Sequence, residues 1–448
     1  MKEVDRLLKD KKYTEVKAFI EEKNPADIAA IIDEIFGDDF EHEKEFLILF
    51  RLLPKDTAAE VFTYMHTDMQ EHLIEAFSDA ELRDILSQSF IDDTVDIIEE
   101  MPANVVSRIL KNSSTGARKA INEILRYPHD SAGSIMTIEY VSLHKDMTVK
   151  EAFDKIRRVG VNKETIYTCY VTENRRLIGI VTVKDLFMSE EDDKINDIME
   201  TNIISVDTRV DKEDVARMFR KYDFLAIPVV DSGNRLVGIV TFDDAMDVIN
   251  EENTEDFSKM AAVTPNDESY FKTGIFKHAM HRIGWLCILM ISATITGILT
   301  DRYNNVFITV PILVSFMPMI MDTGGNCGSQ SSVLIIRGLA LDEIEFKDFF
   351  KVVFKEFRIA IMVSAVLAGV NGLRIYLMYG HDILLSAAVS ISIIFTVIFS
   401  KLIGSSLPML AKKCGLDPAI MATPLISTIV DCCSLFIYFN VAMKMLNI

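Results

Sequence analysis

The sequence predicts a multidomain protein with three parts: an all-α acidic N-terminal domain, an α/β domain and a polytopic α-helical membrane domain with five spans. Three observations predict this organisation: an uneven distribution of charge, an internal repeat and several long runs without charge. The 448 residues carry a formal net charge of -20, and yet 49% of them are hydrophobic. The part from Ile283 onwards is nearly neutral, so the acidic excess lies before it. One ordinary domain is not both this acidic and this apolar.

The acidic balance excludes a nucleic-acid-binding protein that works by neutralising phosphates, because the required basic face is missing. It favours a cationic partner. No two of the six cysteines form a CxxC pair, so neither a zinc site nor a disulfide framework is expected. The first twelve residues alternate in charge and lack an apolar run, which is not the pattern of a secretory signal. We therefore expect the front part to lie in the cytoplasm.

Residues 1–130 are predicted to form the helical N-terminal domain. Several short amphipathic segments are preceded by Pro, Ser, Asp or Asn, which is the pattern of a helix start. Such starts occur at residues 24–27, 54–56, 78–81 and 102–104. Because the segments between them are short, we expect antiparallel helices.

An internal repeat defines the next domain, residues 131–250. LIGIVTVKDL at 177–186 matches LVGIVTFDDA at 236–245, and each copy follows a strand-like run and a polar turn. Strand, turn, strand and then Thr-x-x-Asp at a helix start resembles the tandem CBS domain. That resemblance implies an adenine nucleotide such as ATP, with the Thr and Asp of each motif meeting ribose and phosphate, at Thr182, Asp185, Thr241 and Asp244. The alternative is that both threonines are ordinary N-cap residues.

Acidic residues gather where these parts meet. The run from Asp244 to Asp256 holds six acids and no base, and we expect residues 251–275 to form a helix that connects the repeat domain with the first span. Asp92 and Asp96 are four residues apart and so share one face of a helix. A solvated acidic surface is the alternative explanation of such a run. Further acids in the second copy of the repeat are Asp211, Glu213 and Asp223.

Residues 276–448 are predicted to form the membrane domain. Three stretches without charge are long enough to cross a bilayer, and two more are interrupted once each, by Arg374 and by Asp431. Basic residues flank the first span on its N-terminal side and lie between the second and third spans and between the fourth and fifth. The positive-inside rule then places the N-terminus in the cytoplasm and the C-terminus outside. The five predicted spans are residues 283–300, 303–321, 359–381, 383–400 and 418–443.

Two features of the membrane domain point to a hydrophilic seam between the second and fifth spans. Prolines and glycines crowd residues 311–331, where we expect a break in the helix that lines a wet cavity; the alternative is a small-residue packing face. Asp431 stands near the middle of the fifth span. An ionisable group at such depth usually faces an ion path, and the alternative is a structural partner such as Arg374 or Lys401.

DTGGNCGSQ at 322–330, the DPA motif that begins at Asp417, and Asp431 complete a pattern that resembles the MgtE family of Mg²⁺ channels and transporters. The resemblance covers essentially the whole chain, including DSAGSIMT at 130–137. It implies a homodimer whose second and fifth helices line a pore, with a hydrated Mg²⁺ held at Asp431. The expected pore positions are Asp431, Asn326, Ala419 and Asp417, and Asp322 is assigned no role.

The resemblance also implies that Mg²⁺ closes the channel by binding between the helical domain, the CBS pair and the connecting, or plug, helix. The matching regulatory positions are Glu60, Asp92, Asp96, Gly133, Asp211, Glu213, Asp223, Asp244, Asp247, Glu252, Glu255 and Asp256.

The chemistry of the residues agrees with this implication. Mg²⁺ takes oxygen ligands and sheds water reluctantly, so a carboxylate and an amide suit a pore that passes the hydrated ion. We therefore expect a Mg²⁺-selective channel or transporter of the cell membrane that mediates uptake and has no enzymatic activity. One alternative is a proton-coupled secondary transporter of divalent cations that also carries Mn²⁺ and Co²⁺. The other is a membrane-tethered nucleotide sensor without transport.

Overall fold

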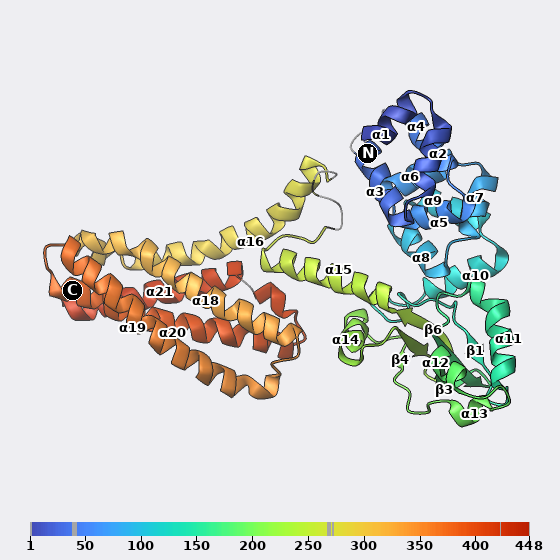
Figure 1. Ribbon diagram of the computed structural model, residues 1–448. Helices are drawn as coiled ribbons and strands as arrows, with labels where there is room; N and C mark the ends of the chain where they lie inside the picture. The colour runs from blue at the N-terminus through green and yellow to red at the C-terminus, as the bar shows by residue number, and fades with distance from the viewer. Residues whose placement is uncertain (1, 38–42, 267–269, 271–272, 422, 448) are drawn as a thin grey trace. The chain divides into compact units, whose positions relative to one another are not determined.

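The computed structural model describes residues 2–37, 43–266, 270, 273–421 and 423–447. It divides into two compact units, Met1–Asn250 and Glu251–Ile448 (Figure 1). Residues 267–269 and 271–272 of the predicted connecting helix, and residue 422 of the predicted fifth span, lie outside the described residues. Each unit is described by itself.

The N-terminal part of the first unit is all-helical, as predicted. Four predicted helix starts are confirmed: Asn24, Pro54, Ser78 and Pro102 are the N-cap residues of α3, α5, α7 and α9. Ser78 forms a capping box with Glu81, which satisfies two backbone donors at the start of α7. The helices are α1 (Lys2–Lys9), α2 (Tyr13–Glu21), α3 (Pro25–Phe36), α4 (Glu43–Arg51), α5 (Lys55–Thr63), α6 (Thr67–Ala76), α7 (Asp79–Leu86), α8 (Ile91–Glu100), α9 (Ala103–Asn112) and α10 (Thr115–Ile124).

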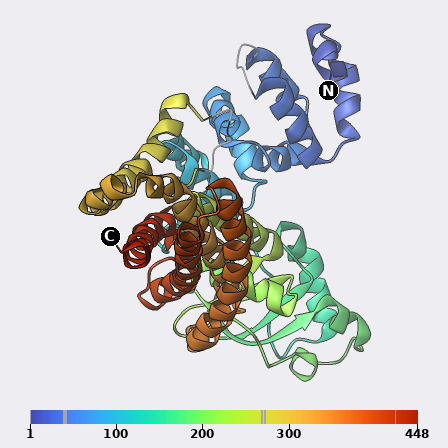
Figure 2. The same cartoon turned by 90° about the vertical axis from the view of Figure 1, so that its left-hand side faces the viewer.

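The repeat domain contains two three-stranded sheets of the same topology, β1-β2-β3 and β4-β5-β6. In each sheet the first pair of strands is parallel and the second antiparallel. Figure 2 shows strands only in the green segment of the chain. The strands are β1 (Ser142–Leu143), β2 (Thr168–Glu173), β3 (Arg176–Thr182), β4 (Val206–Asp207), β5 (Ala226–Val230) and β6 (Leu236–Thr241), and the helices are α11 (Val149–Val159), α12 (Val183–Met188), α13 (Ile195–Ile198) and α14 (Lys212–Tyr222).

The two copies of the repeat exchange contacts. A Cβ atom added to Gly179 of the first copy would lie 2.5 Å from Sδ of Met199, which precedes the second copy. A Cβ atom added to Gly238 of the second copy would lie 2.7 Å from Sδ of Met136, which precedes the first. Only glycine leaves room for these methionines, which explains why the glycine and the methionine both recur in the sequence.

A single apolar core joins the helical domain to the second copy of the repeat. It includes Phe62 and Val95 from the helical domain together with Val215, Phe219 and Val240 from the repeat domain. Within the first unit, α8 is therefore held against the CBS pair by packing.

The connecting helix differs from its prediction at both ends. Helix α15 runs from Phe242 to Met260, so it begins inside the second copy of the repeat and ends well before residue 275. Phe242 directly follows Thr241, the last residue of β6, and the Thr-x-x-Asp motif therefore begins the connecting helix itself.

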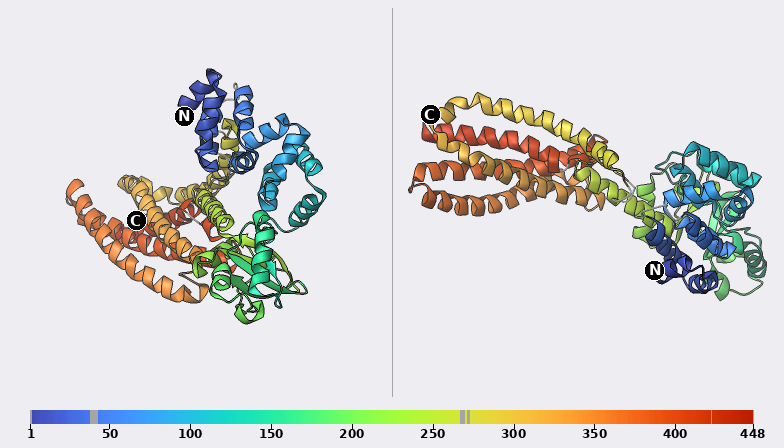
Figure 3. Two further views of the ribbon diagram at one scale, coloured as in Figure 1. Left: turned by 45° about the vertical axis from the view of Figure 1, so that its right-hand side comes forward. Right: turned by 90° about the horizontal axis from the view of Figure 1, so that it is seen from above.

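The second unit contains four helical segments that are long and apolar enough to cross a membrane, among the residues that the structure describes: Ile275–Arg302, Phe346–Met378, Ile383–Lys413 and Pro418–Leu446. Helix α20 packs against α18, α19 and α21, and α16 packs along α21 (Figure 3). No residue of α16 is buried by the described remainder of the chain. The helices are α16 (Ile275–Arg302), α17 (Asn304–Thr309), α18 (Met317–Ala340), α19 (Phe349–Met378), α20 (Ile383–Lys413) and α21 (Thr423–Leu446).

The predicted second span, residues 303–321, is not one helix. It is divided among α17, a 3-10 helix at Pro311–Phe316 and the first turn of α18. The break predicted within residues 311–331 occurs at the 3-10 helix, whereas the prediction is wrong for residues 322–331, because α18 is continuous there. Its glycines form a packing face instead: a Cβ atom added to Gly404 of α20 would collide with the carbonyl oxygen of Gly328. Glycines on both sides let two helix backbones approach closely without breaking either ladder of hydrogen bonds.

Candidate functional site

Asp431 lies against the glycine-rich part of α18, on the half-buried face of α21. A Cβ atom added to Gly325 would be 3.9 Å from Oδ1 of Asp431. Neither basic residue considered as its partner reaches it. Lys401 pairs with Glu356 at 3.8 Å, and Arg374 donates to Sδ of Met319 at 3.0 Å. Within the described residues, Asp431 therefore forms no ion pair with a base.

Asp322 is the residue of this region that sequence reasoning missed. Its carboxylate is close enough to interact electrostatically with that of Asp431. It stands three residues before Gly325, on the same face of α18. Asp322, Asn326 and Gln330 are all exposed in this single chain, and their spacing of four places them on one polar stripe. The spacing of four could have placed Asp322 on this stripe from the sequence alone. The expectation that the helix breaks at its glycines prevented this interpretation.

The predicted pore residue Asp417 and the predicted regulatory residue Glu255 meet at one ammonium group. Nζ of Lys259 lies 2.7 Å from Oδ2 of Asp417 and 2.6 Å from Oε1 of Glu255. Oδ1 of Asp417 accepts the backbone N–H of Ala419 at 2.8 Å, and Ala419 is buried. Burial alone would lower the pKa of Lys259, but its bonds to Asp417 and Glu255 raise it above its ordinary value.

The first unit contains a group of carboxylates between α8, the CBS pair and the start of α15. We call Asp92, Asp93, Glu139, Glu164, Asp243 and Asp244 the buried acid group; Asp92 is buried, Asp243 is exposed and the other four are partly exposed. Asp92 and Asp244 were predicted, and Asp93 and Asp243 are their neighbours on the same helices. Glu139 and Glu164 come from separate segments, and sequence spacing gives no sign that these segments meet.

Burial and mutual repulsion raise the pKa values of four members of the buried acid group, Asp92, Asp93, Glu164 and Asp244. Burial, followed by the charge of Asp244, raises the pKa of Asp92 well above its ordinary range. Burial and the same neighbour raise the pKa of Glu164 to about 8. The pKa values of Asp93 and Asp244 are raised to about 6, chiefly by burial.

Two oxygens of the buried acid group have no hydrogen-bond partner in the described part of the chain, Oδ1 of Asp92 and Oε2 of Glu164. A cation would relieve both the repulsion and the unpaired oxygens. Across the described residues, no three His, Cys, Asp or Glu side chains converge closely enough to hold a metal ion directly. An ion held here would keep part of its water shell, as Mg²⁺ commonly does.

The other predicted regulatory residues are held in local structure. Oδ1 of Asp211 accepts the backbone N–H of Glu213 at 2.9 Å at the start of α14, and Glu213 pairs with Arg217 at 3.0 Å. Asp223 ends α14 in the left-handed conformation, with φ of 54°. Gly133 donates its N–H to the carbonyl of Thr208 at 3.0 Å. Exposed positions are Glu60, Asp96 and Asp247, and partly exposed positions on α15 are Glu252 and Asp256.

The candidate nucleotide residues act as helix caps in this structure. Oγ1 of Thr182 donates to Oδ2 of Asp185, and Oγ1 of Thr241 donates to Oδ2 of Asp244, both at 2.5 Å. Thr182 and Asp185 form a complete capping box at the start of α12. Thr182 is thus the N-cap residue of α12, and Asp244 belongs both to this motif and to the buried acid group.

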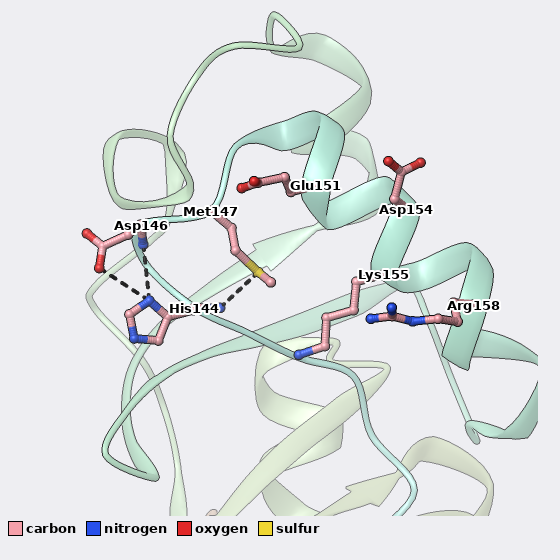
Figure 4. A pocket seen from close by; sticks show the side chains of 7 residues that line it. All are labelled: His144, Asp146, Met147, Glu151, Asp154, Lys155 and Arg158. Carbon is pink, nitrogen blue, oxygen red and sulfur yellow. Dashed lines mark hydrogen bonds and ion pairs between the residues drawn. The ribbon is translucent and has the colours of Figure 1, made fainter.

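A separate surface hollow of about 540 Å³ lies on the first copy of the repeat, between α11 and the loop before it (Figure 4). Its side chains are of mixed charge, and His144 lies 3.3 Å from Asp146. None of the predicted site residues lines it. The lining residues are His144, Asp146, Met147, Glu151, Asp154, Lys155 and Arg158.

Comparison with known proteins agrees with this architecture. Residues 317–441 match the family model described as divalent cation transporter MgtE, residues 23–130 the MgtE intracellular N domain, and residues 132–191 and 195–251 the CBS domain. The chain is similar to the magnesium transporter MgtE of Thermus thermophilus, with 35% identity over 96% of this chain and 95% of the relative. It is also similar to the magnesium transporter MgtE of Bacillus subtilis, with 33% identity over 97% of this chain and 95% of that relative.

Two solved structures each cover about half of this chain. The cytosolic domain of the Mg²⁺ channel MgtE in complex with ATP is 34% identical, has a TM-score of 0.51, and covers 55% of this chain and 98% of its own. The soluble part of a magnesium transporter is 29% identical and has the same TM-score of 0.51. It covers 56% of this chain and 96% of its own. With a helical N-terminal domain, a CBS pair and apolar membrane helices matched over nearly the full length of these relatives, the chain is a membrane protein that belongs to the MgtE family.

Proposed function

We propose that this protein is a Mg²⁺-selective channel or transporter that mediates magnesium uptake across the cell membrane. The observation that carries the proposal is Asp431: a carboxylate within an apolar helix, with no ion-pair partner among the described residues, against the glycine-rich face of α18. A charge at such depth is costly and commonly marks an ion path. The curated relatives are named magnesium transporters, which makes Mg²⁺ the ion to test first.

The pore site combines oxygens that suit a hydrated divalent cation. Asp431 supplies carboxylate oxygens, and Asn326 supplies an amide oxygen on the polar stripe of α18. Asp417 and Ala419 stand at the start of the last helical segment, where Asp417 attracts a cation from the cytoplasmic side. Oxygen ligands favour Mg²⁺ over softer metals, although Cys327, Cys432 and Cys433 lie beside these positions in the sequence.

Cytoplasmic Mg²⁺ closes the pathway in this proposal by binding at the buried acid group and along α15. Two carboxylates about 5 Å apart, at an effective dielectric constant near 20, repel by roughly 3 kcal/mol. Moving a gate from 1:99 to 99:1 requires about 5.5 kcal/mol. Relief of a few such pairs by bound cations is therefore enough to shift the gate. Mg²⁺ acts here as a ligand of the cytoplasmic part as well as the transported ion.

The assembly is proposed to be a homodimer with a cytoplasmic N-terminus and an extracytoplasmic C-terminus. Helix α16 buries no residue within its own described chain, so its apolar surface is available to lipid or to a second copy. The segment made of α17, the 3-10 helix and α18 supplies the fifth crossing, because α18 packs between two helices that are long enough to span.

An adenine nucleotide is a second proposed ligand, at Thr182, Asp185, Thr241 and Asp244 of the CBS pair. The specific support is the 34% identical cytosolic domain that was solved with ATP. Since Asp244 also belongs to the buried acid group, nucleotide and Mg²⁺ would influence each other at this position.

The deciding experiment measures Mg²⁺ entry into liposomes that contain the full-length protein and an entrapped Mg²⁺ indicator. Flux that is independent of a pH gradient and that falls when Mg²⁺ is raised on the cytoplasmic face supports the proposal. Flux that requires a pH gradient supports the proton-coupled alternative, in which Mn²⁺ and Co²⁺ are also carried. No Mg²⁺ flux at all would contradict both and favour a nucleotide sensor.

A further inference from the structure

A buried polar network joins three helices of the membrane domain. Lys401 of α20 and Glu356 of α19 are only 5% and 7% exposed, and Nζ of Lys401 lies 3.8 Å from Oε2 of Glu356. Ser331 of α18 stands between them and is fully buried. Its Oγ donates to Oε2 of Glu356 at 2.7 Å and accepts from Nζ of Lys401 at 3.1 Å. The proposed function does not account for these three residues.

Stability alone is a poor explanation of this network. Removing two opposite charges from water costs free energy that their attraction does not reliably offset, and an apolar pair of similar volume is often as stable. Ionisable side chains are also rare in membrane helices and usually have a functional reason. The question is therefore what the network holds in place.

The network contacts α18 on a buried face and not on the polar stripe. Ser331 is buried, whereas its neighbour Gln330 is the last exposed member of the stripe that also contains Asp322 and Asn326. One turn earlier, Gly328 touches Gly404 of α20, which lies one turn after Lys401. The glycine contact sets the distance between α18 and α20, but it tolerates rotation.

Hydrogen bonds between a single serine and two charged groups depend on direction, so they restrict the rotation and the register of α18. Rotation of α18 determines where its stripe lies relative to Asp431. The network thus acts on the proposed pore through the rotation of α18, without contacting the ion.

We infer that Lys401, Ser331 and Glu356 are positioning residues for permeation, which fix the rotation of α18 and thereby the selectivity of the site at Asn326 and Asp431. This inference rests on the proposed function. It predicts that loss of the Ser331 hydroxyl changes transport even though both charges remain.

The test uses the full-length protein in liposomes with Mg²⁺ and Ca²⁺ indicators. Ser331→Ala removes the bridging hydroxyl, and Ser392→Ala is the matched control, since Ser392 is equally buried but bonds only to the carbonyl of Ala388 in its own helix. We expect Ser331→Ala to lower the ratio of Mg²⁺ to Ca²⁺ flux at least about tenfold, which corresponds to about 1.4 kcal/mol. Ser392→Ala should keep the wild-type ratio.

A double variant, Glu356→Gln with Lys401→Met, protects the test against simple misfolding, because it removes both charges together. We expect it to fold with a wild-type thermal transition and still to show the reduced Mg²⁺ to Ca²⁺ ratio. Wild-type flux and ratio in both Ser331→Ala and the double variant would overturn the inference and leave the network as a packing feature. Absence of Mg²⁺ flux in the wild type would instead count against the proposed function.

Discussion

At the scale of single residues, the position of Asp431 follows from its sequence, but its surroundings do not. An isolated carboxylate in an apolar run already predicts a charge inside the membrane. The spacing of Asp322 from Asn326 and Gln330 indicates its proximity to Asp431 only if α18 remains helical through three glycines. That continuity comes from packing against α20 and α21, which local propensity does not contain.

We predict that Asp431→Asn lowers Mg²⁺ flux at least about tenfold, a loss of about 1.4 kcal/mol in stabilisation of the permeating ion. The amide keeps the volume of the side chain but removes the charge that attracts the cation. Liposome flux per reconstituted protein is the measurement. Asp301→Asn, at the exposed end of α16, is the matched control. Equal flux in Asp431→Asn and wild type would remove Asp431 from the pore.

A second residue-scale prediction concerns Lys259. Its ammonium group occupies oxygens of both Asp417 and Glu255 that would otherwise be open to a cation. In Lys259→Met we therefore expect cytoplasmic Mg²⁺ to close the pathway at a concentration roughly threefold to tenfold lower. The measurement is flux against cytoplasmic Mg²⁺, with Lys351→Met as the control, since Lys351 forms an exposed ion pair with Asp348. An unchanged or higher midpoint would show that Lys259 does not compete with Mg²⁺.

At the scale of elements, the sequence predicts where a helix begins better than where it ends or breaks. The helix starts of the N-terminal domain depend on local caps, and the structure confirms them. The end of α15 at Met260 and the division of residues 303–321 carry no comparable local signal. Hydropathy shows that a segment is apolar, but it does not show whether the helix is continuous.

The contact of α8 with α15 should depend on pH when divalent cations are absent. Four carboxyl groups of the buried acid group, those of Asp92, Asp93, Glu164 and Asp244, have raised pKa values in the folded protein, so their ionisation disfavours the packed state. Stability is therefore greatest below the ordinary carboxyl pKa near 4. It falls as the pH rises through about 6, for Asp93 and Asp244, and about 8, for Glu164.

Hydrogen exchange of α8 in the full-length protein, corrected for the intrinsic effect of pH, measures this dependence. In EDTA we expect protection of Ile91–Glu100 to decrease from pH 5 to pH 8. Added Mg²⁺ should restore protection at pH 8 and have little effect at pH 5, because protonated carboxyls bind the cation poorly. Protection that is the same in EDTA and Mg²⁺ at pH 8 would exclude cation binding at the buried acid group.

At the scale of the whole molecule, the segment that leaves the second copy of the repeat links the proposed sensor with the proposed pore. The acids of this segment belong to one helix that starts at Phe242, so a cation that binds near its start also restrains its acidic turns. The sequence predicted the acidic run, but placed the helix too late. The position of α15 matters because Asp244, at its first turn, is part of the buried acid group.

The last prediction tests this link by neutralising Asp244, Asp247, Glu255 and Asp256 together, to Asn or Gln. The substitutions have two opposing effects. They remove the repulsion that favours the open state, and they remove the carboxylate ligands through which Mg²⁺ stabilises the closed state. Mg²⁺ can shift a gate only by its different affinity for the two states, and the substitutions delete that difference. We therefore expect flux that no longer falls as cytoplasmic Mg²⁺ rises, whatever its basal level.

The matched control neutralises four exposed acids of the N-terminal helices, Asp10, Glu15, Glu21 and Glu22, and so makes the same change in net charge. It should keep the wild-type inhibition curve, because none of its residues belongs to α15 or to the buried acid group. If the α15 variant also keeps that curve, the acidic run is a solvated surface, and the regulatory proposal fails while the pore proposal stands. If both variants lose inhibition, overall charge rather than the site on α15 controls the gate, since long-range attraction of cations would then be sufficient.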